Sequence, residues 1–139
     1  MLKMAVFVSG GGTDLQSVID ACQSGQINGE IKLVVSNRKN AYGLTRASNA
    51  GIETAIVKNN DHLLVEMLKE REIDLIVLAG YLAILTDELI DAYPCKIINI
   101  HPSLIPSFCG PGFYGMHVHE AVLKRGVKVS GATVHFVSS

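Results

Sequence analysis

The fold is decided by the stretch Ile73-Asp74-Leu75-Ile76-Val77-Leu78-Ala79, in which every residue except the aspartate is apolar. Strands in the middle of a parallel sheet are buried on both faces and show such continuous apolar runs, whereas half-exposed strands alternate apolar and polar residues. A run of this length is far too short to cross a membrane as a helix, which needs about 20 residues. We therefore expect Ile73–Ala79 to be the central strand of a parallel sheet.

Shorter apolar runs on both sides of this stretch predict further strands, which are Met4–Val8, Ile31–Val35, Thr54–Val57, Lys96–Ile98 and Lys128–Val137. Helices are expected after Ser9–Asp14, over Gly43–Ala50, from an N-capping Asp61, from Thr86 or Asp87, and over Met116–Lys124. In the first helix, one face carries Leu15, Val18, Ile19 and Cys22 at helical spacing. This alternation predicts a single domain over residues 1–139 with an α/β fold, a doubly wound and mostly parallel sheet with helices on both faces.

Composition argues against several classes of protein. The 139 residues are 48% hydrophobic and 18% charged, with a net charge of -1, which is typical of a globular protein and does not suggest a nucleic-acid or membrane partner. The N-terminal segment runs directly into a glycine loop and is too short for a signal peptide. Cys22, Cys95 and Cys109 form neither a disulfide framework nor a zinc pattern, which favours a reducing, cytoplasmic compartment.

A glycine loop, Ser9-Gly10-Gly11-Gly12-Thr13-Asp14, follows the first expected strand. Successive glycines allow backbone N–H groups to approach an anion at the start of the next helix, so a phosphate is the expected ligand, although a tight turn alone would also need glycine. Leu15 occupies the third-glycine position of a dinucleotide fingerprint, and no lysine follows Gly12 as in a P-loop. A single phosphomonoester fits better, provided that the Asp14 carboxylate points away or caps the helix.

Asn99 and His101 lie two residues apart, directly after the expected strand Lys96–Ile98. Period-two alternation puts both residues on the same face. A carboxamide can donate a hydrogen bond to an oxyanion, and an imidazole can move a proton near neutral pH, so the pair is a candidate catalytic site. The alternative is a pair of strand-end residues satisfied by backbone groups. Parallel strands share one carboxyl edge, so the pair is expected beside the glycine loop and residues 80–82.

The remaining histidines and Cys109 are not expected to be functional. His117 and His119 lie two apart on an expected helix, so they do not share a face, and no third ligand points to a metal site. His62 is expected at the surface where a helix starts, and His135 is expected in a strand. Cys109 lies in a long loop with no basic partner nearby, which argues against a nucleophile.

Six motifs follow one another along the chain, namely Val8–Gln16, Val35–Asn37, Val77–Leu85, Asn99–Pro106, His117–His119 and Gly131–Val137. In this order they resemble the motifs of the folate-dependent formyltransferases, and most closely those of the family that formylates glycinamide ribonucleotide in purine synthesis. They are spread over the whole chain, so the resemblance is more specific than the Asn-x-His-Pro-Ser-Leu-x-Pro element alone would be. It implies the Rossmann-like formyltransferase fold.

The resemblance also implies roles for individual positions. The segment that holds the substrate phosphate is matched by Gly12, Thr13 and Asp14. The backbone that lines the pterin pocket of the co-substrate, 10-formyltetrahydrofolate, is matched by Leu82, Ala83, Ile84 and Leu85. Asn99 would contact the folate and donate to the oxyanion, and His101 would assist proton movement between the amine, the oxyanion and N10. The implied reaction is direct transfer to the amine of glycinamide ribonucleotide, without a metal.

Three departures from the family pattern bear on these expectations. Ala83 stands where many relatives carry a longer residue, often arginine, and the loop Ser107–Met116 is longer than in some relatives. The chain ends at Ser139, before the catalytic Asp that follows the His-Phe-Val strand in the family. That Asp would orient His101 and favour its protonated form. We therefore expect an incomplete domain with weak or no transferase activity, and an uncovered sheet edge or face that favours association, such as a homodimer.

Three alternatives remain open on the sequence alone. A formyl-folate hydrolase would carry a second histidine where Pro102 stands, together with an N-terminal regulatory domain. A methionyl-tRNA formyltransferase would need a long C-terminal domain and a basic surface for tRNA, and this sequence has neither. A non-enzymatic phosphate-binding module is favoured only by the end of the chain at Ser139.

Overall fold

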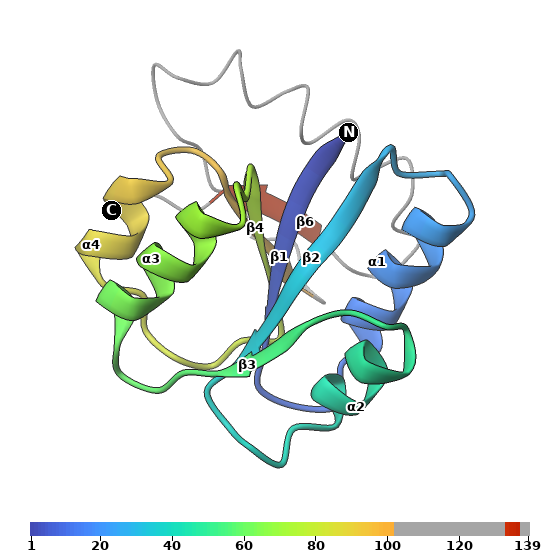
Figure 1. Cartoon of the computed structure of the whole chain (residues 1–139), viewed down its shortest axis with the longest axis horizontal. Helices are drawn as coiled ribbons and strands as arrows, with labels where there is room; N and C mark the ends of the chain where they lie inside the picture. Colours follow the sequence, from blue (N-terminus) through green and yellow to red (C-terminus); the bar gives the residue numbers. More distant parts are fainter. Residues whose placement is uncertain (102–132, 137–139) are drawn as a thin grey trace.

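A computed structural model describes residues 1–101 and 133–136 of the protein. Strands and helices alternate along the chain (Figure 1). The strands are β1 (Leu2–Val8), β2 (Gly29–Ser36), β3 (Thr54–Ile56), β4 (Leu75–Ala79), β5 (Ile97–His101) and β6 (Thr133–Phe136). The helices are α1 (Thr13–Gln23), α2 (Tyr42–Asn49), α3 (Asp61–Glu70) and α4 (Asp87–Ala92).

One sheet contains these strands in the order β3-β2-β1-β4-β5-β6. Strands β1 to β5 pair in parallel, and β6 runs antiparallel to β5. Strand β4, which the sequence predicts to be central, lies between β1 and β5, and all of its residues are buried. The predicted doubly wound, mostly parallel α/β fold is therefore confirmed.

Two apolar cores cover the two faces of the sheet. Helices α1 and α2 lie on one face, and α3 and α4 lie on the other (Figure 1). Because successive strand residues point to opposite faces, Val6 belongs to the core under α1 and Phe7 to the core under α3. The apolar stripe predicted for α1 is confirmed, since Leu15, Val18 and Ile19 are all buried. The sheet is thus covered on both faces, as parallel sheets require.

The predicted cap of α3 is wrong by one residue. Asn60, not Asp61, is the N-cap, and its Oδ1 accepts a hydrogen bond from the N–H of Leu63 at 3.1 Å. This bond satisfies one of the donors that the first turn of a helix leaves unpaired. Both residues are good capping types, so composition alone does not separate them. As the first helical residue, Asp61 has its carboxylate available for a different contact, with Thr86.

The strand predicted as Lys96–Ile98 is also shifted. Strand β5 covers Ile97–His101, so the polar pair Asn99 and His101 lies inside the strand instead of after it. The parallel ladder with β4 continues through Asn99 and Ile100, because backbone pairing does not depend on an apolar side chain. An apolar run therefore understates the length of a strand that carries polar residues at its carboxyl end.

Some expectations lie outside the described residues. These are the helix Met116–Lys124 with His117 and His119, the loop Ser107–Met116 with Cys109, and all but residues 133–136 of the strand Lys128–Val137. Those four residues form β6, which confirms that His135 is in a strand. Within the described part of the chain, no helix has the length and apolar character needed to span a membrane.

Candidate active site

Ser9 joins three strand ends at the carboxyl edge of the sheet. It follows β1 directly and is 1% exposed. Its Oγ donates a hydrogen bond to Oδ1 of Asn37, just after β2, at 2.7 Å. The same Oγ accepts a hydrogen bond from the N–H of Leu82, after β4, at 2.9 Å. The segments that follow β1, β2 and β4 therefore meet at one edge, as the sequence predicts for the glycine loop and residues 80–82.

The glycine loop packs against α2. Gly12 caps α1 in the left-handed conformation, with φ at 77°. A Cβ on Gly12 would lie 2.7 Å from the Cα of Gly43 in α2, so both the backbone angle and the available space require glycine. The N–H of Gly43 donates to the carbonyl of Gly10 at 3.0 Å, and Nε of Arg46 donates to the carbonyl of Gly11 at 2.7 Å. The loop is thus held by α2 as well as by α1.

The other two expected phosphate-segment residues, Thr13 and Asp14, form the first turn of α1. Thr13 is exposed, whereas Asp14 is half-buried, and this burial raises the pKa of its carboxyl group above the ordinary value of 3.8. Gly12, Thr13 and Asp14 are therefore contiguous at a helix N-terminus, where backbone N–H groups have no partner within the helix. Such an end attracts anions through its exposed donors and the helix dipole.

The segment between β4 and α4 carries exposed apolar side chains. Leu82 is 77% exposed and Ile84 is 93% exposed, whereas Ala83 and Leu85 are partly buried. Large apolar side chains that face water next to each other commonly mark a binding surface. These four residues are the ones that the resemblance assigns to the pterin pocket, and the structure places them at the same sheet edge as the glycine loop.

Hydrogen bonds hold both ends of this segment. Near its start, the N–H of Leu82 donates to Ser9. At its end, the N–H and Oγ1 of Thr86 both donate to Oδ2 of Asp61, at 2.9 Å and 2.7 Å. The exposed residues between these two anchors therefore belong to a short loop tied to β1 on one side and to α3 on the other.

Asn99 lies on β5 opposite Leu78 of β4 and is half-buried. Its neighbours Ile98 and Ile100 belong to the core under α1, whereas Ile97 belongs to the core under α3 and α4. Alternation along the strand therefore puts Asn99 on the α3/α4 side of the sheet. The Leu82–Leu85 segment leads into α4 on that same side, so Asn99 and this segment lie on one side of the edge.

His101 is the last residue of β5 and pairs with Thr133 of β6, while Asn99 pairs with His135. The two catalytic candidates occupy alternate positions of one strand, which is the spacing predicted from the sequence. The pairing of Asn99 with His135 was not predicted, because local periodicity carries no information about which distant strand lies alongside. For this pairing, the sequence offered no more than the expected strand Lys128–Val137 near the end of the chain.

Three further residues at this edge were not predicted to have a structural role there, namely Ser9, Arg46 and Asp61. Ser9 and Asp61 act through hydrogen bonds to residues far away in the sequence, on the segment after β4. Arg46 is the basic residue in the last turn of α2, and the glycine loop itself has no basic side chain. The loop is expected to bind an anion but has no cationic side chain of its own. This mismatch is the signal in the sequence that could have pointed to a basic residue on another element, such as Arg46.

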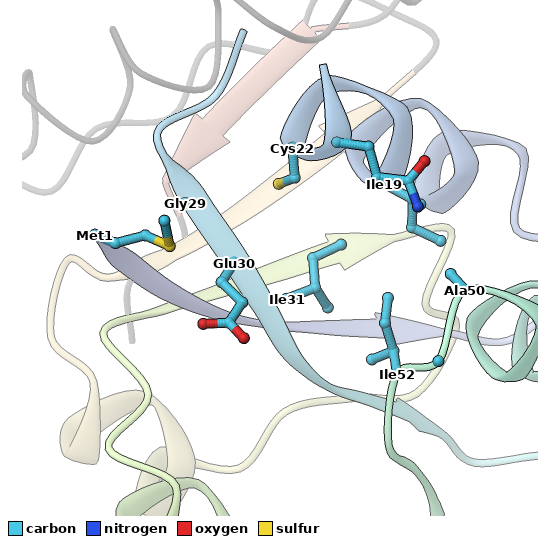
Figure 2. Close-up of a pocket in the computed structure, with 10 residues that line it drawn as sticks. Met1, Ile19, Cys22, Gly29, Glu30, Ile31, Ala50 and Ile52 are labelled. Carbon is cyan, nitrogen blue, oxygen red and sulfur yellow. The ribbon is translucent and has the colours of Figure 1, made fainter. Parts of the chain in front are cut away.

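An open hollow of about 500 Å³ lies where β1 and β2 begin, beside Met1 and Gly29 (Figure 2). It is lined by residues from α1, the start of β2 and the segment after α2, including Ile19, Cys22, Glu30 and Ile52. Burial raises the pKa of the Cys22 thiol to about 11, so this thiol is protonated at neutral pH and a poor nucleophile. Cys22 therefore does not supply an activated nucleophile to this hollow.

No cluster of three or more His, Cys, Asp or Glu residues suited to a metal ion occurs within residues 1–101 and 133–136. His62, expected at the surface, is exposed there, and its ring contacts the carboxylates of Glu66 and Glu88 at 3.2 Å and 2.7 Å. This cluster lies at the start of α3 and joins it to α4.

Comparison with known proteins connects this geometry to a family. The model of the family described as "Formyl transferase" matches residues 2–139. The chain is 42% identical to phosphoribosylglycinamide formyltransferase of Haemophilus influenzae over 99% of its length, and 41% identical to the chloroplastic enzyme of Arabidopsis thaliana over 98%. It spans 66% of the bacterial relative and half of the plant relative.

Solved structures give the same result. Glycinamide ribonucleotide transformylase 1 from Geobacillus kaustophilus superposes with a TM-score of 0.78 at 35% identity, covering 100% of this chain and 76% of that chain. The corresponding protein from Symbiobacterium toebii superposes with a TM-score of 0.77 at 39% identity, covering 99% of this chain and 66% of that chain. The chain therefore belongs to the formyl transferase family, among the phosphoribosylglycinamide formyltransferases.

Proposed function

We propose that this protein transfers a formyl group from 10-formyltetrahydrofolate to the amino group of glycinamide ribonucleotide, N1-(5-phosphoribosyl)glycinamide, in de novo purine (IMP) biosynthesis. The observation that carries the proposal is the meeting of the glycine loop, the exposed segment after β4 and the β5 strand at one sheet edge. Relatives that are 39–42% identical to this chain are named for this activity.

In the proposed reaction, the substrate amine attacks the formyl carbon and a new C–N bond forms. The carbonyl oxygen becomes an oxyanion, to which the carboxamide of Asn99 donates a hydrogen bond. Its half-buried position supports this role, because a donor shielded from water stabilises developing charge more strongly than an exposed one. Asn99 also contacts the bound folate.

His101 is proposed to move the proton that the reaction must transfer. The amine loses a proton as the tetrahedral intermediate collapses, and N10 of the folate gains one as its bond to the formyl carbon breaks. An imidazole suits this transfer because its ordinary pKa of about 6.5 allows it to accept and donate near neutral pH. The carboxamide and the imidazole together supply the chemistry, so the proposed reaction uses no metal ion.

Two binding segments complete the proposal. Gly12, Thr13 and Asp14 hold the substrate phosphate, which is supported by their place at the N-terminus of α1. Leu82, Ala83, Ile84 and Leu85 line the pterin site. The strong exposure of Leu82 and Ile84 supports this assignment, because a flat aromatic ring laid over them would remove apolar surface from water.

The cellular compartment and the binding partners are proposed from the cysteine content and from the exposure of one edge strand. We propose a cytoplasmic protein, because its few cysteines form no disulfide pattern and Cys22 is a free thiol. Small molecules are the proposed partners, without nucleic acid or membrane. The exposed edge strand β3, in which Ile56 is 54% exposed, supports self-association as a homodimer.

Sequential isothermal titration tests this proposal. The chain is titrated with glycinamide ribonucleotide and then with a non-reactive 10-formyltetrahydrofolate analogue. We expect both ligands to bind, with the ribonucleotide losing most of its affinity when its phosphate is removed. Binding of the folate analogue without any binding of the ribonucleotide would instead indicate another folate-dependent formyltransferase. Binding of neither ligand would overturn the proposal.

A further inference from the structure

The orientation of the glycine loop is set by α2 through two consecutive carbonyl groups. The Gly10 carbonyl accepts a hydrogen bond from the N–H of Gly43 at 3.0 Å. The next carbonyl, of Gly11, accepts one from Nε of Arg46 at 2.7 Å. Both acceptors therefore face α2, although nothing in the loop's own sequence dictates this orientation, since glycine backbones rotate freely.

These two bonds also determine where two N–H groups point. No peptide bond in the described residues is cis, and in a trans peptide the C=O and N–H groups point in opposite directions. The peptide that carries the Gly10 carbonyl carries the N–H of Gly11, and the peptide that carries the Gly11 carbonyl carries the N–H of Gly12. Both N–H groups therefore point away from α2. Neither donates to another group within the described residues.

Arg46 is itself held in place. Its Nη1 donates to Oε1 of Gln16 on α1 at 3.4 Å, and its guanidinium carbon lies 5.0 Å from the centre of the Tyr42 ring. The contact between Gly12 and Gly43 brings α2 close enough for this reach. A guanidinium fixed on three sides is a rigid support for the carbonyl that it binds.

We infer that Arg46 is a positioning residue for phosphate recognition: by holding the Gly11 carbonyl, it aims the N–H groups of Gly11 and Gly12 together at the phosphate of the substrate. Consecutive N–H groups that converge in this way form a concave anion site. This inference rests on the proposed function, because it takes the loop ligand to be a phosphomonoester. It adds a residue on a different helix that acts on the phosphate through the backbone of the loop.

The test compares Arg46→Met with a matched control, Arg71→Met. Each variant removes one guanidinium, and methionine retains much of the apolar stem. Arg71 pairs with Glu53 through Nη2 and Oε2 at 2.6 Å, at the end of α3, and does not contact the glycine loop. Affinities for glycinamide ribonucleotide and for the nucleoside that lacks its phosphate are measured by isothermal titration for the wild type and both variants.

We expect Arg46→Met to weaken ribonucleotide binding on the order of 10-fold, the typical effect of losing a hydrogen bond from a charged donor. Binding of the dephosphorylated nucleoside should stay unchanged in the same variant, which a general loss of structure would not allow. Arg71→Met should match the wild type for both ligands. Equal ribonucleotide affinity in Arg46→Met and wild type would overturn the inference while leaving the proposed function intact.

Two further measurements distinguish positioning of the loop by Arg46 from direct attraction between the Arg46 charge and the phosphate. If Arg46 acts through the loop, its effect should be the same at about 0.1 M and about 1 M salt, whereas a direct charge effect would shrink as the salt shortens the Debye length. In a ¹H–¹⁵N spectrum, inorganic phosphate should shift the Gly11 and Gly12 amide signals of the wild type, and Arg46→Met should need on the order of 10-fold more phosphate for the same shifts. An effect that disappears at high salt, or the same phosphate dependence of these shifts in both proteins, would contradict the inference. A wild type that binds no ribonucleotide would overturn both the inference and the proposed function.

Discussion

Asn99 is the residue on which the proposed chemistry depends most directly. Replacing it by alanine should slow single-turnover formyl transfer by about 10²–10³-fold, the usual cost of removing one oxyanion donor. The ribonucleotide affinity should not change, since the phosphate segment lies on other elements. Asn40→Ala, at an exposed turn before α2, is the matched control. An Asn99→Ala variant with the wild-type rate would show that this carboxamide does not contact the oxyanion.

Gly12 must be glycine both because its φ is positive and because a side chain would clash with Gly43, whereas Gly25 has the positive φ alone. Gly12→Ala should lower the free energy of unfolding by about 3 kcal/mol, because it adds a clash with Gly43 to the cost of a positive φ. Gly25 has a similar φ, 81°, but a methyl group added there would have no atom within 4 Å, so Gly25→Ala should cost about 1 kcal/mol. Urea unfolding measures both. Equal losses would mean that the contact with α2 carries no strain.

At the scale of elements, α3 holds the segment that precedes α4. Thr86→Val keeps the side-chain shape but removes the bond from Oγ1 to Asp61, and should lower stability by about 1 kcal/mol. It should also weaken binding of a folate analogue, because one anchor of the Leu82–Leu85 segment is loosened. Thr45→Val, on the exposed surface of α2, is the control. Unchanged folate affinity in Thr86→Val would separate this anchor from the proposed pterin site.

The contact of α3 with α4 should also depend on pH. The Glu88 carboxylate raises the pKa of His62 above its ordinary value of 6.5, through a hydrogen bond and through its charge. The Glu66 carboxylate raises this pKa further, by a smaller amount. Because the pKa is raised in the folded state, the stabilisation is fully present below about pH 6.5 and is lost as the pH rises through the higher folded value. Unfolding midpoints measured across this range should fall more in the wild type than in His62→Gln.

Glu88→Gln and Glu66→Gln make this pH prediction more specific. Since the contact with Glu88 is the larger cause of the shift, Glu88→Gln should remove more of the pH dependence than Glu66→Gln. NMR titration of the His62 ring signals measures the same order directly. A His62 pKa at its ordinary value in the wild type would contradict the account of this cluster.

Element types were predictable from the sequence, whereas their ends were not. The apolar run at Ile73–Ala79 and the stripe on α1 identify a buried strand and a helix, because burial imposes a pattern on consecutive residues. The cap at Asn60 was missed because it depends on a single hydrogen bond that the neighbouring Asp61 could equally make. The extension of β5 through His101 was missed because backbone pairing continues beyond the apolar run.

At the scale of the whole molecule, the sheet separates two cores that should behave independently. Val18→Ala, in the core under α1, and Leu64→Ala, in the core under α3, should each lower the free energy of unfolding by about 2–3 kcal/mol. With the sheet between them, the double variant should show the sum of the two effects to within about 0.5 kcal/mol. A larger deviation in denaturant unfolding would show that the sheet transmits strain between its faces.

The candidate site shows the limit of sequence reasoning at this scale. Topology alone brings the ends of β1, β4 and β5 to one edge, so the glycine loop, residues 82–85 and Asn99 were predictable as neighbours. The contacts that orient them were not, because Ser9, Arg46 and Asp61 bind groups in segments distant in sequence. Patterns of apolar residues along the sequence indicate which residues are buried, whereas these hydrogen bonds depend on how whole helices and strands pack against one another.

The most direct test of the proposed function is detection of the transferred group. The chain, in excess over substrate, is mixed with glycinamide ribonucleotide and 10-formyltetrahydrofolate carrying a ¹³C-labelled formyl group, and the products are analysed by mass spectrometry. We predict that labelled formylglycinamide ribonucleotide forms together with tetrahydrofolate in equal amounts. Release of labelled formate without any formylated ribonucleotide would contradict the proposed transfer of the formyl group to glycinamide ribonucleotide.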